Sequence, residues 1–176
     1  MSYYRQQLEQ WLSTTHVNAH RVIDVGGKQG EVKSRVKSWN VDDYQILDLP
    51  KWDLDKPWKV GEDLKADTVF CLEVFEYLIN PTQALKNISD LLKPGGVAYV
   101  TFQFIYPQHN EVEMDSLRYT IAGVERLAEV SDLTLSMIWP RIDKSGLLTK
   151  FYMADGMRAA KNMNHAVTGW IVEFIK

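Results

Sequence analysis

The stretch VIDVGGKQGE, Val22 to Glu31, joins an apolar segment to a cluster of glycines. A short apolar run that ends in turn residues is typical of a buried strand, which we place at 21–25. Glycines after a strand leave backbone N–H groups uncovered at the start of the next element, where phosphates and nucleotides often bind. We therefore expect a nucleotide-like ligand at Gly26–Gly30, and Lys28 is the residue that looks out of place there.

Composition limits the classes of function. The chain has 176 residues, 45% of them apolar and 24% charged, so we expect one globular domain over 1–176. The net charge of −3 disfavours a nucleic-acid partner. A lone cysteine, Cys71, rules out a disulfide framework, and the histidines show no metal-ligand spacing, so we expect no metal.

No apolar run reaches the length of a membrane span, and the N-terminus lacks a signal-peptide pattern. We therefore expect a cytoplasmic protein that does not bind membranes. The sequence leaves the oligomeric state open.

Strands and helices are predicted to alternate along the chain. The clearest helix starts at Pro81, because Asn80 can cap it and Gln83 stands three residues after the cap, and it ends near Lys93. The remaining predicted helices are 3–15, within an N-terminal segment 1–20, then 30–39 and 121–130; the strands are 21–25, 44–47, 68–72, 97–102, 133–138 and 170–175. Such alternation indicates a mostly parallel sheet, whose ligands bind beyond the carboxyl ends of the strands.

Asp48 strengthens the expectation of a nucleotide-like ligand. It ends a predicted strand about twenty residues after Gly26, the position at which an acidic side chain accepts ribose hydroxyls. The alternative is a turn residue before Pro50. Two common glycine motifs fail here: the loop is not G-x-G-x-x-G, and Gly27-Lys28 is not followed by Ser or Thr.

A third pattern fits. Asp24-Val-Gly-Gly-Lys-Gln-Gly30 resembles the first motif of class I S-adenosylmethionine-dependent methyltransferases, an acidic residue followed by G-x-G-x-G. FCLEVFEYLINPTQALKNISDLLKPGG (70–96) is similar to the segment from the family's fourth strand to its fifth. FIYPQHNEVEMDSLRYT (104–120) is similar to a loop of a small-molecule, type 11-like subgroup. The resemblance covers about residues 20 to 140 and implies a Rossmann-like, seven-stranded, mostly parallel sheet with helices on both faces and an antiparallel last strand.

The resemblance also implies the cofactor, S-adenosylmethionine, and the residues that hold it. Asp24 would orient the loop and help to hold the methionine amino group, and the loop glycines would line the methionine and ribose portions. Asp48 would take the ribose hydroxyls, and Asp53 would meet the adenine amino group. Leu72 and Glu73 would lie beside the cofactor. The implied cofactor-binding set is Asp24, Gly26, Gly27, Gly30, Asp48, Asp53, Leu72 and Glu73.

The chain departs from the family pattern at Lys28, which takes the place of the middle glycine. If that position needs a positive φ, a lysine costs on the order of 1 kcal/mol. Tyr77 also replaces a histidine that is common after Glu76.

His109 is the candidate catalytic base, and the alternative is a loop histidine bonded to Asp115 or to backbone. Residues 144–165, with Met153, Met157 and Met163, are a candidate cover for the site.

We therefore expect methyl transfer from S-adenosylmethionine to a small-molecule or saccharide-like acceptor, at oxygen or nitrogen. The first alternative is a catalytically inactive binding or scaffold protein with the same fold. A nucleotide-dependent oxidoreductase is disfavoured by the failed fingerprint. A macromolecular acceptor stays open, and the net acidity makes RNA the poorer choice.

Overall fold

Six strands form one mixed sheet in the order β2-β1-β3-β4-β6-β5 in the computed structural model, which describes residues 3–108, 114–148, 150 and 166–176. Its elements are α1 (Tyr3–Leu12), β1 (His16–Val25), β2 (Ser38–Leu47), β3 (Ala66–Cys71), α2 (Pro81–Leu91), β4 (Leu92–Gln103), α3 (Ile121–Glu129), β5 (Thr134–Ile142) and β6 (Val167–Ile175). The first four strands pair in parallel, and β6 runs antiparallel to both β4 and β5. The mostly parallel sheet with an antiparallel last strand is confirmed, but the expectation of seven strands is wrong.

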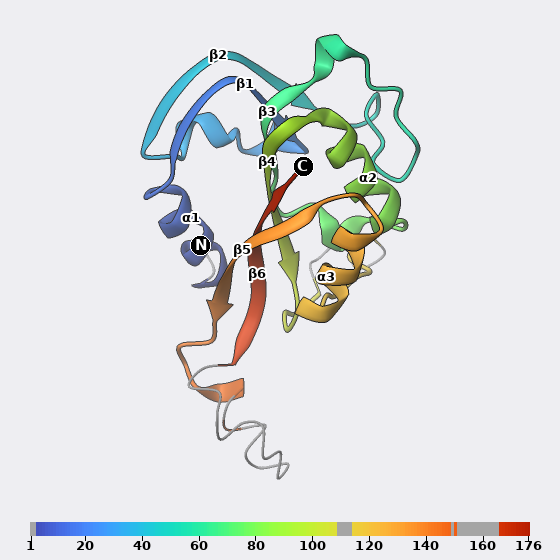
Figure 1. Ribbon diagram of the computed structural model, residues 1–176. Coiled ribbons are helices and arrows are strands. Elements are labelled where there is room, and N and C mark those ends of the chain that lie inside the picture. The colour runs from blue at the N-terminus through green and yellow to red at the C-terminus, as the bar shows by residue number, and fades with distance from the viewer. Residues whose placement is uncertain (1–2, 109–113, 149, 151–165) are drawn as a thin grey trace.

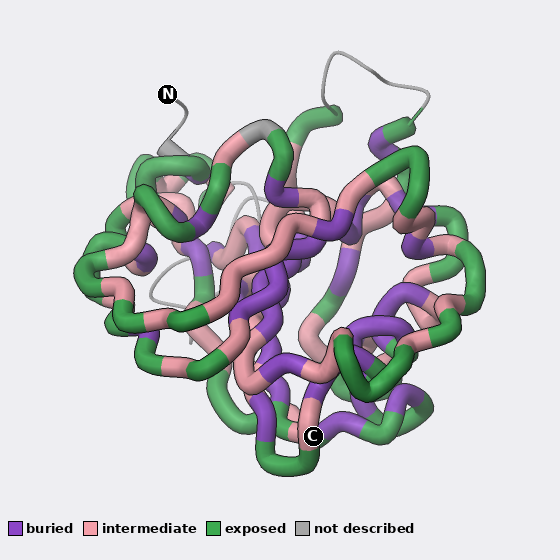
Figure 2. The backbone as a smooth tube through the Cα atoms, turned by 90° about the horizontal axis from the view of Figure 1, so that it is seen from above, coloured by how far each residue is buried: buried purple, intermediate pink, exposed green. Residues whose placement is uncertain are grey.

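The sheet is covered on both faces. Helices α2 and α3 lie on one side and α1 lies on the other (Figure 1). Leu85, Ile88 and Val124 pack with Phe102 in the larger core cluster, on the α2 and α3 side. The smaller cluster, on the α1 side, is built from Leu8, Leu12, Val17, Val22, Val32, Phe70 and Ile171. In Figure 2 the buried backbone runs through the central strands, and the exposed residues form the rim.

Local sequence signals explain helix α2. The side chain of Asn80 accepts a hydrogen bond from the Gln83 N–H at 3.2 Å, and Pro81 occupies the first turn, where its missing N–H is not needed. Ala84, Leu85 and Ile88 are buried against the sheet. Helix α3 begins in the same way, because Thr120 Oγ1 accepts the Gly123 N–H at 3.1 Å. Both helices confirm the sequence-based prediction.

The predicted helix over 30–39 is wrong. Residues 32–34 form a 3-10 turn, and strand β2 begins at Ser38. Polar and apolar side chains alternate in the sequence Ser-Trp-Asn-Val-Asp that opens β2, and this period of two is typical of a half-buried strand. The same alternation extends β1 back to His16. The alternation therefore outweighs the helical spacing of Val32, Val36 and Trp39.

Residues 48–65 join β2 to β3 through turns, and no further strand forms among them. The rings of Trp52 and Trp58 meet edge to face with centroids 5.1 Å apart. The buried Asn87 of α2 holds this segment, because its Oδ1 accepts the Trp58 N–H at 3.1 Å and its Nδ2 donates to the Leu54 carbonyl at 3.1 Å. The segment is thus tied to α2 by hydrogen bonds to Asn87.

Candidate functional site

The glycine loop turns sharply at the carboxyl end of β1. Gly26 has φ +79°, a left-handed conformation that favours glycine, and its N–H donates to the Leu47 carbonyl at 2.9 Å. A Cβ on Gly26 would lie 2.5 Å from Cγ2 of Val74, which follows β3. A 3-10 turn at Gly27–Gln29 comes next. The loop therefore lies close to the residues after β3, as the expected cofactor site requires.

Asp24 holds this loop from below. The side chain is buried, and its Oδ2 accepts hydrogen bonds from the Tyr44 hydroxyl at 2.7 Å and the Val32 N–H at 3.0 Å. A Cβ on Gly27 would lie 2.4 Å from the Asp24 carboxyl carbon. Burial raises the pKa of Asp24, and the two hydrogen bonds oppose that rise. These contacts suit the loop-orienting role expected for Asp24.

Asp48 closes β2 beside the glycine loop. Its Oδ2 accepts the Lys28 N–H at 3.1 Å and its Oδ1 accepts the Leu49 N–H at 2.7 Å. A carboxylate oxygen can accept two hydrogen bonds, so each oxygen of the partly exposed Asp48 can still accept a ribose hydroxyl. The hydrogen bond from Lys28 joins the glycine loop to Asp48, the two parts of the expected cofactor-binding site, here called the cradle.

Lys28 sits in the loop without backbone strain. The non-glycine residues with positive φ in the described chain are Glu73 and Asp132, so lysine pays no left-handed cost at position 28. Its ammonium donates to the Leu49 carbonyl at 2.7 Å. The side chain therefore reaches along the rim of the loop to the end of β2.

Three other expected residues have less direct placements. Asp53 pairs with Lys56 at 2.8 Å, and this hydrogen bond lowers the pKa of Asp53. Gly30 has an extended backbone, φ −177°, that any residue adopts. Leu72 packs in the cluster on the α1 side. His109 lies outside the described residues, as does most of 144–165.

Glu73 belongs to a second polar group that the sequence analysis missed. Its N–H donates to Thr101 Oγ1 at 2.6 Å, and its Oε1 accepts from Nη2 of Arg141 at 2.5 Å. The Arg141 side chain is only 1% exposed, and its guanidinium carbon lies 4.0 Å from the centre of the Tyr4 ring. An arginine inside the apolar strand 134–142 was the available sequence signal, since arginine is seldom fully buried unless paired.

Glu76 and Gln103 extend this group. Both are fully buried, and Gln103 Nε2 donates to Glu76 Oε1. Burial, reinforced by the charge of Glu73, raises the pKa of Glu76 to about 8. Five buried polar atoms of this group have no hydrogen-bond partner among the described residues: Tyr4 Oη, Glu76 Oε2, Gln103 Oε1, Arg141 Nε and Arg141 Nη1. Each such atom costs about 1–3 kcal/mol unless something satisfies it.

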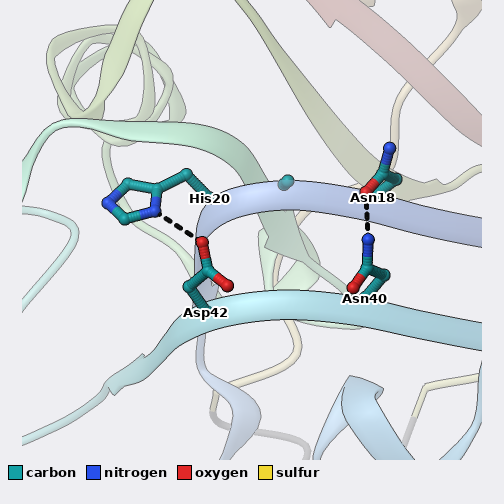
Figure 3. A pocket seen from close by; sticks show the side chains of 5 residues that line it. Asn18, His20, Asn40 and Asp42 are labelled. Carbon is teal, nitrogen blue, oxygen red and sulfur yellow. Dashed lines mark hydrogen bonds and ion pairs between the residues drawn. The ribbon is translucent and has the colours of Figure 1, made fainter.

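The described surface also has a depression of about 290 Å³ far from these groups, on β1 and β2. Asn18, Ala19, His20, Asn40 and Asp42 line it. Figure 3 shows the His20–Asp42 pair and the Asn40–Asn18 hydrogen bond, which link the two strands. The two distances are 2.8 Å and 2.6 Å. These residues belong to the amino-terminal halves of their strands, away from the loop, so we do not assign the ligand there.

A known family model, the methyltransferase domain, matches residues 7–98, which is more than half of the chain. The matched region contains the glycine loop, Asp48 and the segment through Glu76. The chain belongs to the class I methyltransferase family. No curated protein sequence matches this methyltransferase-family chain.

Solved structures show the same fold at low sequence identity. The complex between the Haloferax volcanii Trm112 methyltransferase activator and a methyltransferase matches with TM-score 0.61, 15% identity and 98% and 88% coverage of the two chains. An S-adenosylmethionine-dependent methyltransferase from Mesorhizobium loti matches with TM-score 0.58, 9% identity and 98% coverage of both chains. The [4+2]-cyclase SpnF also matches, with TM-score 0.60, 14% identity and 97% and 80% coverage. The fold of this methyltransferase domain therefore does not by itself define the reaction.

Among the described residues, no helix is both long and apolar enough to cross a membrane.

Proposed function

We propose that this chain binds S-adenosylmethionine at the glycine loop and transfers its methyl group to a small-molecule or saccharide-like acceptor, at oxygen or nitrogen. The observation that carries the proposal is the Asp48 carboxylate, which is tied to the loop through the Lys28 N–H and keeps lone pairs for a ribose. Asp48 is also the carboxylate at the end of β2 that the sequence analysis assigned to the ribose.

The other cradle residues follow from this placement. Gly26, Gly27 and Gly30 would lie along the methionine and ribose, with Asp24 holding the loop in shape. Asp53 would face the adenine, and Leu72 and Glu73 would flank the cofactor at the end of β3. The residues present fit the group, because Gly26 and Val74 are in contact and so place the loop against the end of β3.

Methyl transfer requires alignment more than acid–base chemistry. When bound, S-adenosylmethionine supplies an electrophilic methyl carbon: the acceptor lone pair forms the new bond as the S–C bond breaks, leaving a neutral thioether. The chain must hold the acceptor in line, exclude water and receive the acceptor proton. His109 remains our candidate for the proton, and 144–165 remains the candidate cover.

The proposal includes three broader expectations. We propose one methyltransferase domain over 1–176, in the cytoplasm, with a small-molecule acceptor as its partner. The acidic net charge supports a partner other than nucleic acid.

Isothermal titration of the purified chain with S-adenosylmethionine and S-adenosylhomocysteine tests the proposal. We expect micromolar binding that weakens at least about tenfold in Asp48→Asn, which keeps the shape and loses the charged acceptor. Asp42→Asn is the matched control, because Asp42 lies on β2, the strand before Asp48, but pairs with His20. Wild-type protein that binds neither compound would overturn the proposal.

Lys28→Gly answers a narrower question in the same titration. The lysine ammonium is engaged with the Leu49 carbonyl at the loop rim. We therefore expect the affinity to change by less than about threefold, because an exposed hydrogen bond contributes little. A larger loss would mean that Lys28 contacts the cofactor carboxylate directly.

A further inference from the structure

The polar atoms without partners converge from strands β4 and β5, from helix α1 and from the turn after β3. Gln103 of β4, Gly169 of β6 and Arg141 of β5 are paired in register across the sheet. Residues in register on adjacent strands point to the same face. Glu76, in the turn after β3, reaches Gln103 from the next strand along. The group therefore lies at one edge of the sheet, the carboxyl end of β3, β4 and β5.

Gly169 and Tyr4 define the space between these side chains. A Cβ on Gly169 would lie 2.4 Å from the Tyr4 hydroxyl, so the glycine gives the tyrosine room to cover the group. Tyr4 in turn lies over the Arg141 guanidinium and under the ring of Tyr106, whose centroid is 4.5 Å away. The Tyr4 hydroxyl itself has no hydrogen-bond partner among the described residues.

Donors and acceptors are separated within the group. The donors without partners are Nε and Nη1 of Arg141, whose Nη2 is held by Glu73. The acceptors without partners are Gln103 Oε1 and, when the carboxyl of Glu76 is ionised, Glu76 Oε2. A ligand that satisfies both sides needs an anionic oxygen at one end and a hydroxyl or amine donor at the other.

We propose that Arg141, Glu76 and Gln103 bind the methyl acceptor, and that this acceptor is a small hydroxy or amino acid whose carboxylate meets Arg141 and whose hydroxyl or amine donates to Glu76 and Gln103. Tyr4 covers the acceptor once it is bound. This assignment rests on the proposed methyltransferase function, and it narrows the acceptor to a carboxylate with a nearby donor.

The position of the group agrees with this role. Glu73 links the two sites, because it follows β3 beside Val74, which touches Gly26, and it pairs with Arg141. An acceptor on Arg141 would thus lie next to the residues that we place beside the cofactor. Transfer requires the two reactants to be side by side.

Titration of the whole chain with L-lactate and L-alanine, in the presence of S-adenosylhomocysteine, tests the assignment. Propionate lacks the donor and lactamide lacks the charge, so both serve as matched probes. We expect lactate or alanine to bind and each matched probe to bind at least about tenfold more weakly. Equal binding of propionate, or no binding of either acid, would overturn the assignment.

Three variants localise the binding. We expect Gln103→Leu to weaken acid binding at least about tenfold, because the donor of the acid loses its acceptor. Ser131→Ala is the control: Ser131 Oγ is also buried without a partner among the described residues but lies outside this group, and acid binding should not change. Tyr4→Ala should also weaken acid binding, because the ring that covers the bound acid and packs on Arg141 is removed. Loss of binding in Ser131→Ala but not in Gln103→Leu would contradict the assignment.

The titration of S-adenosylhomocysteine alone separates this assignment from the proposed function. Cofactor binding without acid binding would overturn the acceptor site and leave methyl transfer standing. Acid binding by a chain that takes no S-adenosylhomocysteine would also overturn it, because the acid would then not be a methyl acceptor.

Discussion

The polar side chains at the carboxyl ends of the strands differ between the two halves of the sheet. At β1 and β2, Asp24 and Asp48 are engaged by hydrogen bonds from the chain itself. At β3, β4 and β5, atoms of Glu76, Gln103 and Arg141 are buried without partners among the described residues. Polar groups whose hydrogen bonds are all made within the chain form a rigid structure. Buried polar groups without hydrogen-bond partners are suited to binding a ligand. The glycine loop is thus preformed, whereas we propose that a bound ligand completes the group around Arg141.

Among the substitutions considered, removing the counter-charge of Arg141 should lower the free energy of unfolding most. Glu73→Gln leaves a buried guanidinium without its carboxylate, and breaking such a pair costs about 3–5 kcal/mol; Glu73 is partly exposed, so we expect about 3 kcal/mol. Urea unfolding followed by circular dichroism measures the loss. Arg141→Met, which removes the buried charge as well, is the comparison and should cost less. Equal losses would mean that packing of the arginine stem, and not its charge, dominates.

The pH dependence of Glu76 gives the next effect. Its folded pKa of about 8 lies above the ordinary 4.5, so the folded state holds the proton more tightly, and stability is lost as pH rises toward 8. The charged groups that act on it are Glu73, Arg141 and Asp115. Between about pH 5 and pH 7 the wild type should lose about 2 kcal/mol relative to Glu76→Gln, which cannot ionise.

Parallel unfolding curves of the two proteins across this range provide the measurement. A difference that stays constant with pH would show that Glu76 is ionised in the folded state, and the comparison between the two halves of the edge would then need revision.

A substitution at Asp24 should lower the stability of the half of the sheet that contains β1 and β2. Asp24→Ala leaves the Val32 N–H and the Tyr44 hydroxyl without their acceptor, and we expect a loss of about 2 kcal/mol. Tyr44→Phe removes one donor and keeps the carboxylate, so about half that loss should follow. If Tyr44→Phe costs as much as Asp24→Ala, the Val32 hydrogen bond contributes nothing to the loop. Thermal unfolding of the three proteins distinguishes these cases.

Gly26→Ala should have the smallest effect of the series, about 1–2 kcal/mol. The alanine must adopt φ near +79°, and its Cβ would meet Val74 Cγ2. Val74→Ala removes the clash and not the strained backbone, so the double variant should recover part of the loss. Full recovery would show that the contact with Val74, and not the backbone conformation, requires glycine. A double-mutant cycle of unfolding free energies separates the two terms.

The sequence correctly predicted those parts of the fold that depend on residues close together along the chain. The capping of α2 by Asn80 and the strand–glycine turn at Val25–Gly26 are local, and both are confirmed in the structure. The helix expected over 30–39 failed because the alternation after Ser38 belongs to a strand that is stabilised by pairing with β1. Local propensity does not contain that pairing.

The group of residues that we propose to bind the methyl acceptor could not be predicted in the same way. Tyr4, Glu76, Gln103 and Arg141 are widely separated in the sequence. The register of β4, β6 and β5 brings Gln103 and Arg141 together, and contacts from α1 and from the turn after β3 add Tyr4 and Glu76. Whether a buried atom has a partner is a property of the folded chain alone. The motif that contains Glu76 pointed to the right end of the sheet, but nothing local identified Arg141 as its neighbour.

The position of β6 between β4 and β5 also sets an order of assembly. Strands β4 and β5 do not pair with each other; each is hydrogen-bonded to β6. During synthesis, Gln103 and Arg141 therefore emerge long before the strand that joins them, and the sheet closes only when 167–175 are available. Pairing between distant segments slows folding because the intervening loop must be ordered first. We therefore expect the half of the sheet that we assign to the acceptor to form last, whereas β1 and β2 can pair early.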